Sequence, residues 1–281
     1  MTAALRAFVV GHPISHSRSP LIHGFWLREH GLAGSYERID VAPADFAAFL
    51  RGFPDRGFRG GNVTIPHKEA AFRLVDAPTP RARRLQAANT LWIEDGRLHG
   101  DNTDELGFMA SLDQTLGSDW SEPARTALVL GAGGAARAVI AGLLDRGLER
   151  VLIANRTLER AEDLSAFDRA RIEPIAWEAV GTALPDADVL VNTTSLGMTG
   201  QPPLDLALDG LPDHAVVTDL VYVPLETPLL AAARGRGLRA VDGLGMLLHQ
   251  AVPGFARWFG VTPVVTPALR AHVVADLEKH A

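Results

Sequence analysis

The stretch Thr126-Ala-Leu-Val-Leu-Gly-Ala-Gly-Gly-Ala-Ala-Arg137 decides the fold of this chain. Its short apolar run is typical of a buried strand, and the turn Gly131-Ala132-Gly133-Gly134-Ala135 leads into a helical run that ends near Leu144. The glycines let the backbone approach a phosphate group, and the start of the helix offers unpaired N–H groups and the positive end of the helix dipole. This order of strand, glycine turn and helix predicts a nucleotide-binding unit of the Rossmann type.

The end of the next strand indicates which nucleotide is bound. The strand Arg150–Ala154 ends in Asn155-Arg156-Thr157, and Arg160 follows one turn later. NAD-binding units carry Asp or Glu at this place, about 20 residues past the glycines, to bind the ribose 2′-hydroxyl. Two arginines can instead hold a 2′-phosphate through charge-assisted hydrogen bonds. We therefore expect NADP(H) rather than NAD(H). The alternative is a solvated loop arginine beside a helix cap, a position that Thr157 suits.

The bulk composition excludes several classes of protein. The chain has 281 residues, a formal net charge of −6 and no cysteine, so disulfides and thiolate chemistry are excluded. The chain lacks the clustered excess of basic residues that a nucleic-acid partner would require. No apolar stretch reaches membrane-spanning length. The N-terminal residues lack the charge pattern and cleavage site of a signal peptide. We expect a cytoplasmic protein, with the oligomeric state left open and a homodimer among the options.

Strand and helix signals alternate along the chain, which favours an α/β architecture with a largely parallel sheet. Asp95-Gly96 is a typical hairpin turn pair, and Ser19-Pro20 is a typical helix start with Ser19 as the N-cap. The strands that we expect are 5–10, 36–41, 61–65, 89–94, 97–100, 126–130, 150–154, 189–193, 215–220 and 238–241. The helices that we expect are 19–30, 43–52, 69–75, 103–116, 135–144, 243–259 and 267–280.

The simplest division gives two domains with a cleft between them. Residues 1–103 together with 241–281 form a mostly parallel α/β substrate domain, and residues 104–240 form the NADP-binding Rossmann domain.

Lys68 and Asp104 are the candidates for proton transfer. Lys68 closes the run Asn62-Val-Thr-Ile-Pro-His-Lys68 at the end of a predicted strand, and Asp104 closes Gly100-Asp-Asn-Thr-Asp104 at the end of another. Ligands of open α/β sheets sit at such strand ends. An ammonium can donate a proton to a carbonyl oxygen as a hydride reaches its carbon, while a carboxylate orients the ammonium. The alternative for Lys68 is a solvated surface charge.

Hydroxyl groups at the start of the first helix suit a carboxylate. Ser17 and Ser19 lie at that N-terminus, where N–H groups and the dipole favour an anion, although Ser19 as a plain helix cap is an equal alternative. The histidines His12, His16 and His23 follow no compact metal-ligand spacing, and we expect no metal site.

Three further segments follow strands of the nucleotide half. Asn192-Thr-Thr-Ser195, which includes Thr194, places small hydroxyls at a strand end and suits a loop beside the nicotinamide, with a plain turn as the alternative. Tyr222 would place a phenol in the cleft or would only pack. Met246, Leu247 and Gln250 share a helix face, either as core residues or as part of the site.

Together, these motifs resemble the shikimate dehydrogenase family, and the match spans nearly the whole chain in the family's order. The resemblance is carried by Ser17-Arg-Ser19-Pro20, Asn62–Lys68, Ala88-Asn89-Thr90, Gly100–Asp104, Gly131–Ala135, Asn155-Arg-Thr157, Asn192–Ser195 and Asp242-Gly-Leu-Gly245.

The resemblance implies reversible NADPH-dependent reduction of 3-dehydroshikimate to shikimate, with Lys68 as acid/base and Asp104 as its partner. By the same resemblance, Ser17, Ser19 and Thr64 bind the substrate carboxylate. Asn89, Asp104 and Gln250 bind ring hydroxyls, and Tyr222 contacts substrate. The implied cofactor positions are Gly131 to Ala135, Asn155 to Arg160, Thr194, Ser195, Leu220, Gly243 and Met246.

The chain departs from the family pattern at a few positions. Glu105 replaces a common Gly, Gly24 a common Asn, and His67 a frequent Phe, while Gln86-Ala-Ala-Asn89 replaces Gly-Ala-Val-Asn. Two alternatives stay open. One is a paralogue that acts on quinate or an amino analogue, and the other is a non-catalytic module that senses a nucleotide.

Overall fold

The computed structural model describes residues 5–279, and the chain divides into two compact units. The first unit holds residues up to 104 and 250–276, and the second holds 105–249 and the residues from 277 onward. The predicted boundary at residue 241 therefore differs from this division. Residues 241–249 lie in the second unit because Val241 belongs to its core and Met246 packs against that core.

The first unit is built on a sheet of six strands, with the order β2-β1-β3-β5-β6-β4. Its strands are β1 (Leu5–Gly11), β2 (Gly34–Asp40), β3 (Gly60–Val63), β4 (Ala77–Pro78), β5 (Thr90–Glu94) and β6 (Arg97–Asp101). β1 pairs in parallel with β2 and β3, whereas β5 is antiparallel to β3 and β6. Asp95 and Gly96 have φ of 51° and 72°, the left-handed conformation that a tight hairpin turn requires. The predicted hairpin is thus confirmed.

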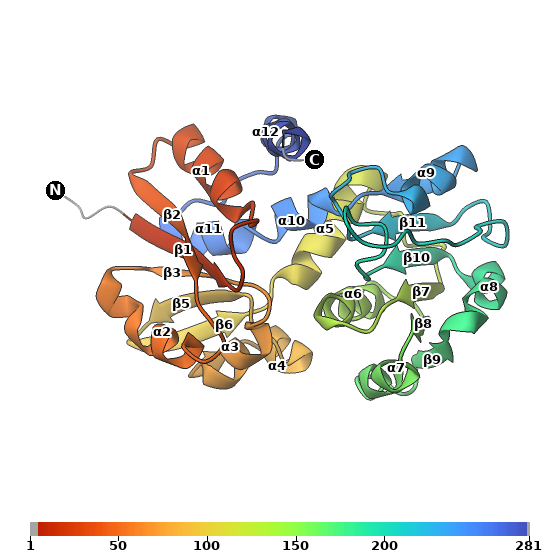
Figure 1. The fold of residues 1–281 in the computed structure, drawn as a ribbon, viewed down its shortest axis with the longest axis horizontal. Coiled ribbons are helices and arrows are strands. Elements are labelled where there is room, and N and C mark those ends of the chain that lie inside the picture. The colour runs from red at the N-terminus through yellow and green to blue at the C-terminus, as the bar shows by residue number, and fades with distance from the viewer. Residues whose placement is uncertain (1–4, 280–281) are drawn as a thin grey trace. The chain divides into compact units, whose positions relative to one another are not determined.

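Helices cover both faces of this sheet (Figure 1). On one face, Phe8 of β1 meets Phe49, Phe53 and Phe58 edge to face, with ring centroids 5.1 to 5.3 Å apart. Buried aromatic pairs of this kind add about 0.5–1.5 kcal/mol each beyond their buried area. The helices are α1 (Ser19–Glu29), α2 (Phe46–Gly52), α3 (Lys68–Leu74), α4 (Pro80–Leu85), α11 (Val252–Phe259) and α12 (Pro267–Glu278), with the 3-10 turn η1 (Pro54–Arg56).

The second unit is built on a parallel sheet with the order β9-β8-β7-β10-β11-β12. Its strands are β7 (Thr126–Leu130), β8 (Arg150–Asn155), β9 (Ile172–Ala176), β10 (Val189–Asn192), β11 (Val216–Asp219) and β12 (Arg239–Val241). In chain order this is 3-2-1-4-5-6, the order of a dinucleotide-binding Rossmann sheet. The strand order reverses between the parallel neighbours β7 and β10, and the crevice at that point is where such sheets bind dinucleotides.

Two apolar layers sandwich the second sheet. Val129, Val151 and Val191 point to one layer, and Leu128, Leu152 and Leu190 point to the other. Strands that are buried on both faces are expected to be almost wholly apolar, as the sequence of β7 is. The helices are α5 (Asp104–Leu116), α6 (Gly134–Asp145), α7 (Leu158–Ser165), α8 (Val180–Ala183), α9 (Pro228–Gly235) and α10 (Leu244–His249), with the 3-10 turns η2 (Trp177–Ala179) and η3 (Leu184–Asp186).

Some local expectations are wrong. Ser19 is the first residue of α1 rather than its cap: Arg18 holds the cap position, and Ser17 Oγ accepts the Ser19 N–H at 3.4 Å. The single helix expected over 243–259 is two helices, α10 and α11. β9 was not expected, because Pro174 weakens its strand signal; β9 is an edge strand, where proline is tolerated. The last helix ends at Glu278, and the predicted end at His280 lies outside the described residues.

Within residues 5–279, no helix combines the length and the apolar composition that crossing a membrane requires.

Candidate active site

Lys68 occupies the first position of α3, directly after the turn that follows β3. The His67 N–H donates to the Thr64 carbonyl at 2.9 Å and closes this turn. The buried His67 ring donates from Nε2 to the Val41 carbonyl at 2.7 Å and stacks on Phe46 with centroids 4.2 Å apart. His67 thus anchors the turn that carries Lys68, which is the structural role of this departure from the family pattern.

The structure brings Lys68 and Asp104 together. Lys68 Nζ donates to Asp104 Oδ2 at 2.5 Å, although the two residues are 36 positions apart in sequence. The Asp104 side chain is 8% exposed and the Lys68 side chain 28%, so the carboxylate is held inside the protein while the ammonium still reaches solvent. Asp104 is also the first residue of α5, where the helix dipole favours an anion. The pair is therefore a charge-assisted hydrogen bond with one accessible end.

Asn89 holds the other oxygen of Asp104. Asn89 Nδ2 donates to Asp104 Oδ1 at 2.8 Å, and Asn89 Oδ1 accepts the backbone N–H of Thr103 at 2.9 Å. The Thr103 hydroxyl donates to the Gln250 carbonyl at 2.8 Å, so the segment before α11 is tied to the loop before α5. Four of the candidate residues, Lys68, Asp104, Asn89 and Gln250, are thus joined within the first unit.

The three carboxylate candidates lie on two adjacent loops of the first unit. Ser17 is half-buried, and its carbonyl accepts Nε and Nη2 of Arg38 at 2.9 and 2.7 Å. Ser19 is buried at the start of α1. A Cβ on Gly11 would lie 2.6 Å from Thr64 Cγ2, so the loops after β1 and β3 are in direct contact. Arg38 therefore fixes the loop that presents Ser17.

The glycine turn of the second unit fits a phosphate. Gly131 has φ of 101°, and a Cβ there would lie 2.7 Å from Thr193 Oγ1, so only glycine fits this position. A Cβ on Gly133 or Gly134 would meet nothing within 4 Å, which leaves open space at the turn. No side chain caps the N-terminus of α6. The turn thus presents uncapped N–H groups to an open space, as pyrophosphate binding requires.

The loop after β8 carries two uncommitted guanidinium groups. Arg156 and Arg160 are exposed, and neither side chain has an ion-pair or hydrogen-bond partner among residues 5–279. Asn155 accepts the Ala132 N–H at 3.2 Å and donates to the Thr157 carbonyl at 2.7 Å, which ties this loop to the glycine turn. Thr157 holds the cap position of α7 without a side-chain cap bond. The loop therefore offers two free cations beside the phosphate turn, which fits a 2′-phosphate.

The loop after β10 packs on the glycine turn. The Thr193 N–H and hydroxyl both donate to the Leu130 carbonyl, at 2.8 and 2.7 Å. The Thr194 hydroxyl donates to Asn192 Oδ1 at 2.7 Å, so it serves the turn itself, whereas Ser195 is exposed. Of the two predicted cofactor residues in this loop, Ser195 is therefore the one with an exposed side chain.

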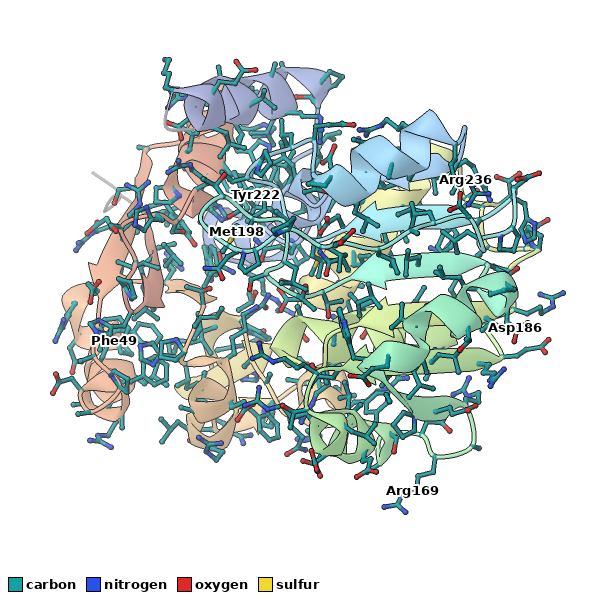
Figure 2. The ribbon with its side chains drawn as sticks, turned by 45° about the vertical axis from the view of Figure 1, so that its right-hand side comes forward. Phe49, Arg169, Asp186, Met198, Tyr222 and Arg236 are labelled. Carbon is teal, nitrogen blue, oxygen red and sulfur yellow. The ribbon has the colours of Figure 1, made fainter. Side chains whose placement is uncertain are left out.

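Leu220, Gly243 and Met246 form one group in the second unit. A Cβ on Gly243 would lie 2.2 Å from the Leu220 carbonyl oxygen, so the segments after β11 and β12 touch at this point. Leu220 and Met246 both pack against the same apolar core. Tyr222 is half-buried on the loop after β11, and the Thr199 N–H donates to the Val223 carbonyl at 2.9 Å, so the loops that carry Met198 and Tyr222 adjoin (Figure 2).

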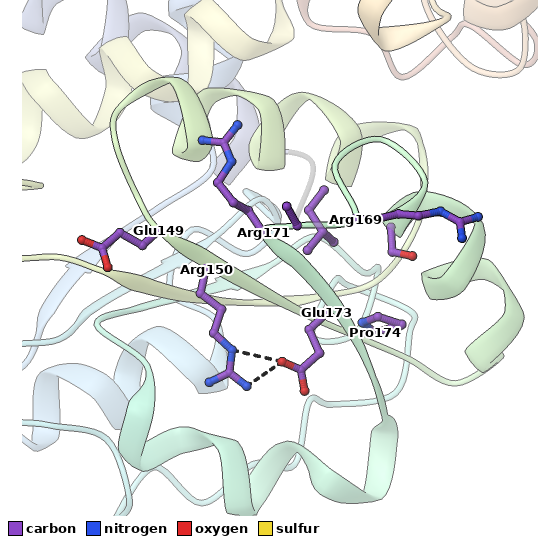
Figure 3. Close-up of a pocket in the computed structure, with 9 residues that line it drawn as sticks. Glu149, Arg150, Arg169, Arg171, Glu173 and Pro174 are labelled. Carbon is purple, nitrogen blue, oxygen red and sulfur yellow. Dashed lines mark hydrogen bonds and ion pairs between the residues drawn. The ribbon is translucent and has the colours of Figure 1, made fainter.

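A groove at the opposite end of this sheet is of a different kind (Figure 3). It lies at the start of β8 and β9, where Arg150 Nε and Nη2 both donate to Glu173 Oε2 at 3.1 and 2.6 Å. Ligands of parallel sheets bind at the carboxyl ends of the strands, so this groove is not the nucleotide site.

Several buried polar residues that connect to Asp104 through Asn89 have no role predicted from the sequence. Tyr36, Asn62, Thr90 and Thr103 are buried and hydrogen-bonded to one another or to Asn89. The sequence feature that could have indicated them is a polar residue within a buried strand, such as Asn62 in β3. Among residues 5–279, no group of three or more metal-ligating side chains lies together.

Comparison with known proteins gives matches along most of the chain. Residues 9–91 match the family model of the shikimate dehydrogenase substrate binding domain, and residues 115–198 match that of shikimate / quinate 5-dehydrogenase. The shikimate dehydrogenase (NADP(+)) of Methylobacterium radiotolerans is 65% identical over 277 residues, which are 98% of each chain. This chain belongs to the shikimate dehydrogenase family.

Further members of the family bear out the fold. The shikimate dehydrogenase (NADP(+)) of Azorhizobium caulinodans is 62% identical over 97% of this chain and 96% of its own. Shikimate 5-dehydrogenase from Thermus thermophilus, solved with NADP(H) and shikimate, has a TM-score of 0.83 and 37% identity, covering 96% of this chain and 99% of that one. Quinate dehydrogenase from Corynebacterium glutamicum, solved with NAD, has a TM-score of 0.88 and 30% identity, covering 97% and 99%. The predicted family and α/β fold are thus confirmed.

Proposed function

We propose that this chain catalyses the reversible, NADPH-dependent reduction of 3-dehydroshikimate to shikimate. The observation that carries this proposal is the 2.5 Å contact between Lys68 Nζ and Asp104 Oδ2. The two residues follow β3 and β6, which end at the same edge of the first sheet, in a chain 65% identical to a named shikimate dehydrogenase. Bound NADPH supplies the hydride that reaches the carbonyl carbon.

Lys68 supplies the proton in this reaction. Its ammonium donates to the carbonyl oxygen, which becomes the hydroxyl of shikimate, and the neutral amine then regains a proton from solvent through its exposed end. In the reverse direction the neutral amine accepts the hydroxyl proton. Arginine could not take this role because its guanidinium is not deprotonated in proteins. Lys68 is one of only two lysines in the sequence, the other being Lys279.

Asp104 orients Lys68 and binds a ring hydroxyl. Its two oxygens accept from Lys68 and Asn89, and a carboxylate has lone pairs for further donors, so a substrate hydroxyl can add to the same group. Asn89 and Gln250 bind the remaining hydroxyls, and Tyr222 contacts the substrate. Ser17, Ser19 and Thr64 bind the substrate carboxylate from the two loops that meet at Gly11.

The second unit binds NADP(H). The open glycine turn from Gly131 to Ala135 receives the pyrophosphate, and Arg156 and Arg160 bind the 2′-phosphate, with Asn155 holding their loop in place. The loops after β8 and β10 contribute Thr157, Thr194 and Ser195 to the cofactor site. The nicotinamide side is formed by Leu220, Gly243 and Met246. The free guanidinium groups favour NADP(H) over NAD(H), because they would have no phosphate partner with NAD(H).

The test is a steady-state assay of the purified protein that follows nicotinamide absorbance with shikimate or quinate and with NADP⁺ or NAD⁺. We expect the highest kcat/KM with shikimate and NADP⁺. A preference for quinate, which the similarity to a quinate dehydrogenase makes the second candidate, would reassign the substrate. No turnover with any pair, together with tight NADPH binding, would favour a nucleotide-sensing module.

We also propose that the enzyme is cytoplasmic and homodimeric. The first statement rests on the composition of the chain, and cell fractionation tests it. The second is tested by sedimentation at several protein concentrations, where a constant monomer mass would contradict it.

A further inference from the structure

A continuous set of buried polar side chains runs across the first sheet to Asp104. Tyr36 of β2 lies over β1, where its register partner is the small Ala7, and its hydroxyl reaches Asn62 of β3 at 2.6 Å. Asn62 pairs in register with Thr90 of β5, and Asn62 Nδ2 lies 3.2 Å from Thr90 Oγ1. Thr90 Oγ1 lies 2.9 Å from Asn89 Oδ1. All of these side chains are buried, so their polar groups must satisfy one another.

The direction of every hydrogen bond in this set is fixed by its neighbours. The Asn62 amide faces the Asn89 backbone carbonyl at 3.0 Å, and because a carbonyl only accepts, the facing atom is Nδ2. Asn62 therefore turns Oδ1 to Tyr36, and the Tyr36 hydroxyl must donate. The Asn89 amide faces the Thr103 N–H, so the facing atom is Oδ1, and Thr90 must donate its hydrogen to it.

The result is a chain of donors that all point to one carboxylate. Tyr36 donates to Asn62, Asn62 to Thr90, Thr90 to Asn89, and Asn89 to Asp104. Hydrogen bonds aligned in this way polarise one another inside a protein, and the last donor of the chain meets the anion. Asn89 Oδ1 accepts from both Thr90 and Thr103, which prevents the amide from turning its oxygen to Asp104.

We propose that Tyr36, Asn62 and Thr90 are positioning residues that act through Asn89 to hold Asp104, and with it Lys68, in the geometry for proton transfer. This rests on the proposed acid–base role of Lys68 and Asp104. None of the three reaches Lys68 or Asp104 in a direct hydrogen bond among the described residues; Asn89 makes the contact with Asp104.

Among the charged groups near these hydrogen-bonded side chains, Lys68 is the cation that pairs with Asp104. At the far end, His23 stacks on Tyr36 with ring centroids 3.9 Å apart and an angle of 11° between the planes. Burial lowers the pKa of His23 to about 3, so this ring adds no positive charge near neutral pH. On the neighbouring elements, Asp101 is paired with Arg81, and Glu105 follows Asp104 in α5. Within the described part of the chain, the cation in contact with Asp104 is Lys68.

The test compares Thr90→Val with Thr90→Ser. Valine keeps the shape of threonine but removes the donor to Asn89, whereas serine keeps the donor. One readout is the rate at which an amine-acylating reagent modifies Lys68 relative to Lys279, measured by mass spectrometry, which is simple because the sequence has only these two lysines. The other readout is kcat and KM for shikimate and NADP⁺.

For Thr90→Val we expect the Lys68/Lys279 acylation ratio to rise about 2- to 10-fold, because one net hydrogen bond no longer supports the ion pair. We expect kcat to fall by a similar or larger factor, with KM for NADP⁺ unchanged, and Thr90→Ser to restore both readouts. Tyr36→Phe, which removes the first donor, should shift both readouts in the same direction by a smaller factor. Thr266→Val, which removes a cap bond of α12 in the same unit, serves as the stability control and should leave both readouts at the wild-type value.

Two outcomes would overturn the proposal, and a third would separate it from the proposed function. An unchanged acylation ratio and kcat in Thr90→Val would show that this chain of hydrogen bonds does not position Asp104. Equal loss of activity in Thr90→Val and Thr90→Ser, with a fall in Tm, would show that the site needs the packing of threonine rather than its hydroxyl. If the wild type turns over no shikimate but the acylation ratio shifts as expected, the positioning chain stands and the proposed function fails.

Discussion

Asp104 accepts Lys68 Nζ on one oxygen at 2.5 Å and Asn89 Nδ2 on the other at 2.8 Å. Lys68 and Asp104 come from the starts of two different helices, α3 and α5. Both oxygens of the buried carboxylate are therefore held by hydrogen bonds. The ammonium of Lys68 is fixed by one of them and remains partly exposed. This arrangement is what a general acid needs: a defined position and access to the reacting group.

Asp104→Asn should reduce kcat for shikimate oxidation by about 10²- to 10³-fold, within the usual contribution of acid–base groups. The amide keeps the shape but loses the charge that orients the ammonium. Because we propose that Asp104 also binds a ring hydroxyl, KM for shikimate should rise. Stopped-flow and steady-state rates at saturating NADP⁺ measure both effects, and a variant with wild-type kcat would exclude Asp104 from the proton-transfer pair.

Arg156→Ala should weaken NADPH binding by about 10- to 100-fold and NADH binding far less, because the charge-assisted hydrogen bonds that we propose to the 2′-phosphate would be lost. Fluorescence titration of the bound nicotinamide gives both dissociation constants. Arg169→Ala is the matched control, since Arg169 is also an arginine of this unit without a partner among residues 5–279, but it lies at the groove at the other strand ends (Figure 3). Equal losses for NADPH and NADH would remove the case for a 2′-phosphate site.

Gly131→Ala should lower the free energy of unfolding by more than about 1 kcal/mol and abolish tight NADPH binding. The backbone there has φ of 101°, and the new Cβ would lie 2.7 Å from Thr193 Oγ1 and 2.9 Å from Thr194 Cγ2. Urea unfolding measures the first effect. Gly181→Ala in α8 is the control: its Cβ would meet nothing within 4 Å, and alanine favours a helix, so this variant should be as stable as the wild type or more so. A Gly131→Ala protein of wild-type stability would contradict the close packing of this turn.

His23 should make stability depend on pH. Burial lowers its pKa from 6.5 to about 3, and the nearby Asn62 side chain opposes this shift. Neither ring nitrogen has a partner at hydrogen-bond geometry among the described residues. Between pH 6.5 and 3 the unfolded chain binds the proton and the folded chain does not, so stability falls as the pH is lowered, by up to about 1.4 kcal/mol per pH unit. Above pH 6.5 both states are neutral and this dependence vanishes.

His23→Phe should remove that dependence. Phenylalanine can keep the stack on Tyr36 and leaves no buried nitrogen without a partner at this position. Urea unfolding at pH 7, 6 and 5 should show a smaller loss of stability in His23→Phe than in the wild type. Parallel curves for the two proteins would mean that folding does not lower the pKa of His23.

Local signals allowed much of the nucleotide unit to be predicted. The glycine turn, the strand β8 and the loop at Arg156 are close in sequence, and the strand–turn–helix order requires their arrangement. The pairing of Lys68 with Asp104 was predictable because both follow strand ends of one sheet. The strand β9 was missed because Pro174 interrupts its pattern, and the division near residue 249 depends on how α10 packs, which no local pattern shows.

The chain of hydrogen bonds from Tyr36 to Asn89 could not be predicted in the same way. Tyr36, Asn62 and Thr90 lie on three strands, and only the register of the sheet brings them into line. A polar residue in a buried strand indicates that a partner exists but does not identify it. The roles of the candidate substrate and cofactor residues stay predictions, because they concern molecules that the sequence does not contain.

Lys68 is the residue that we propose to transfer the proton. The most direct measurement is kcat for shikimate oxidation by Lys68→Ala, with the NADPH dissociation constant measured on the same sample and Lys279→Ala as the control. We expect kcat to fall by about 10²- to 10⁴-fold, NADPH binding to stay within about twofold of the wild type, and Lys279→Ala to behave as the wild type. A Lys68→Ala enzyme that oxidises shikimate at the wild-type rate would show that Lys68 does not transfer the proton.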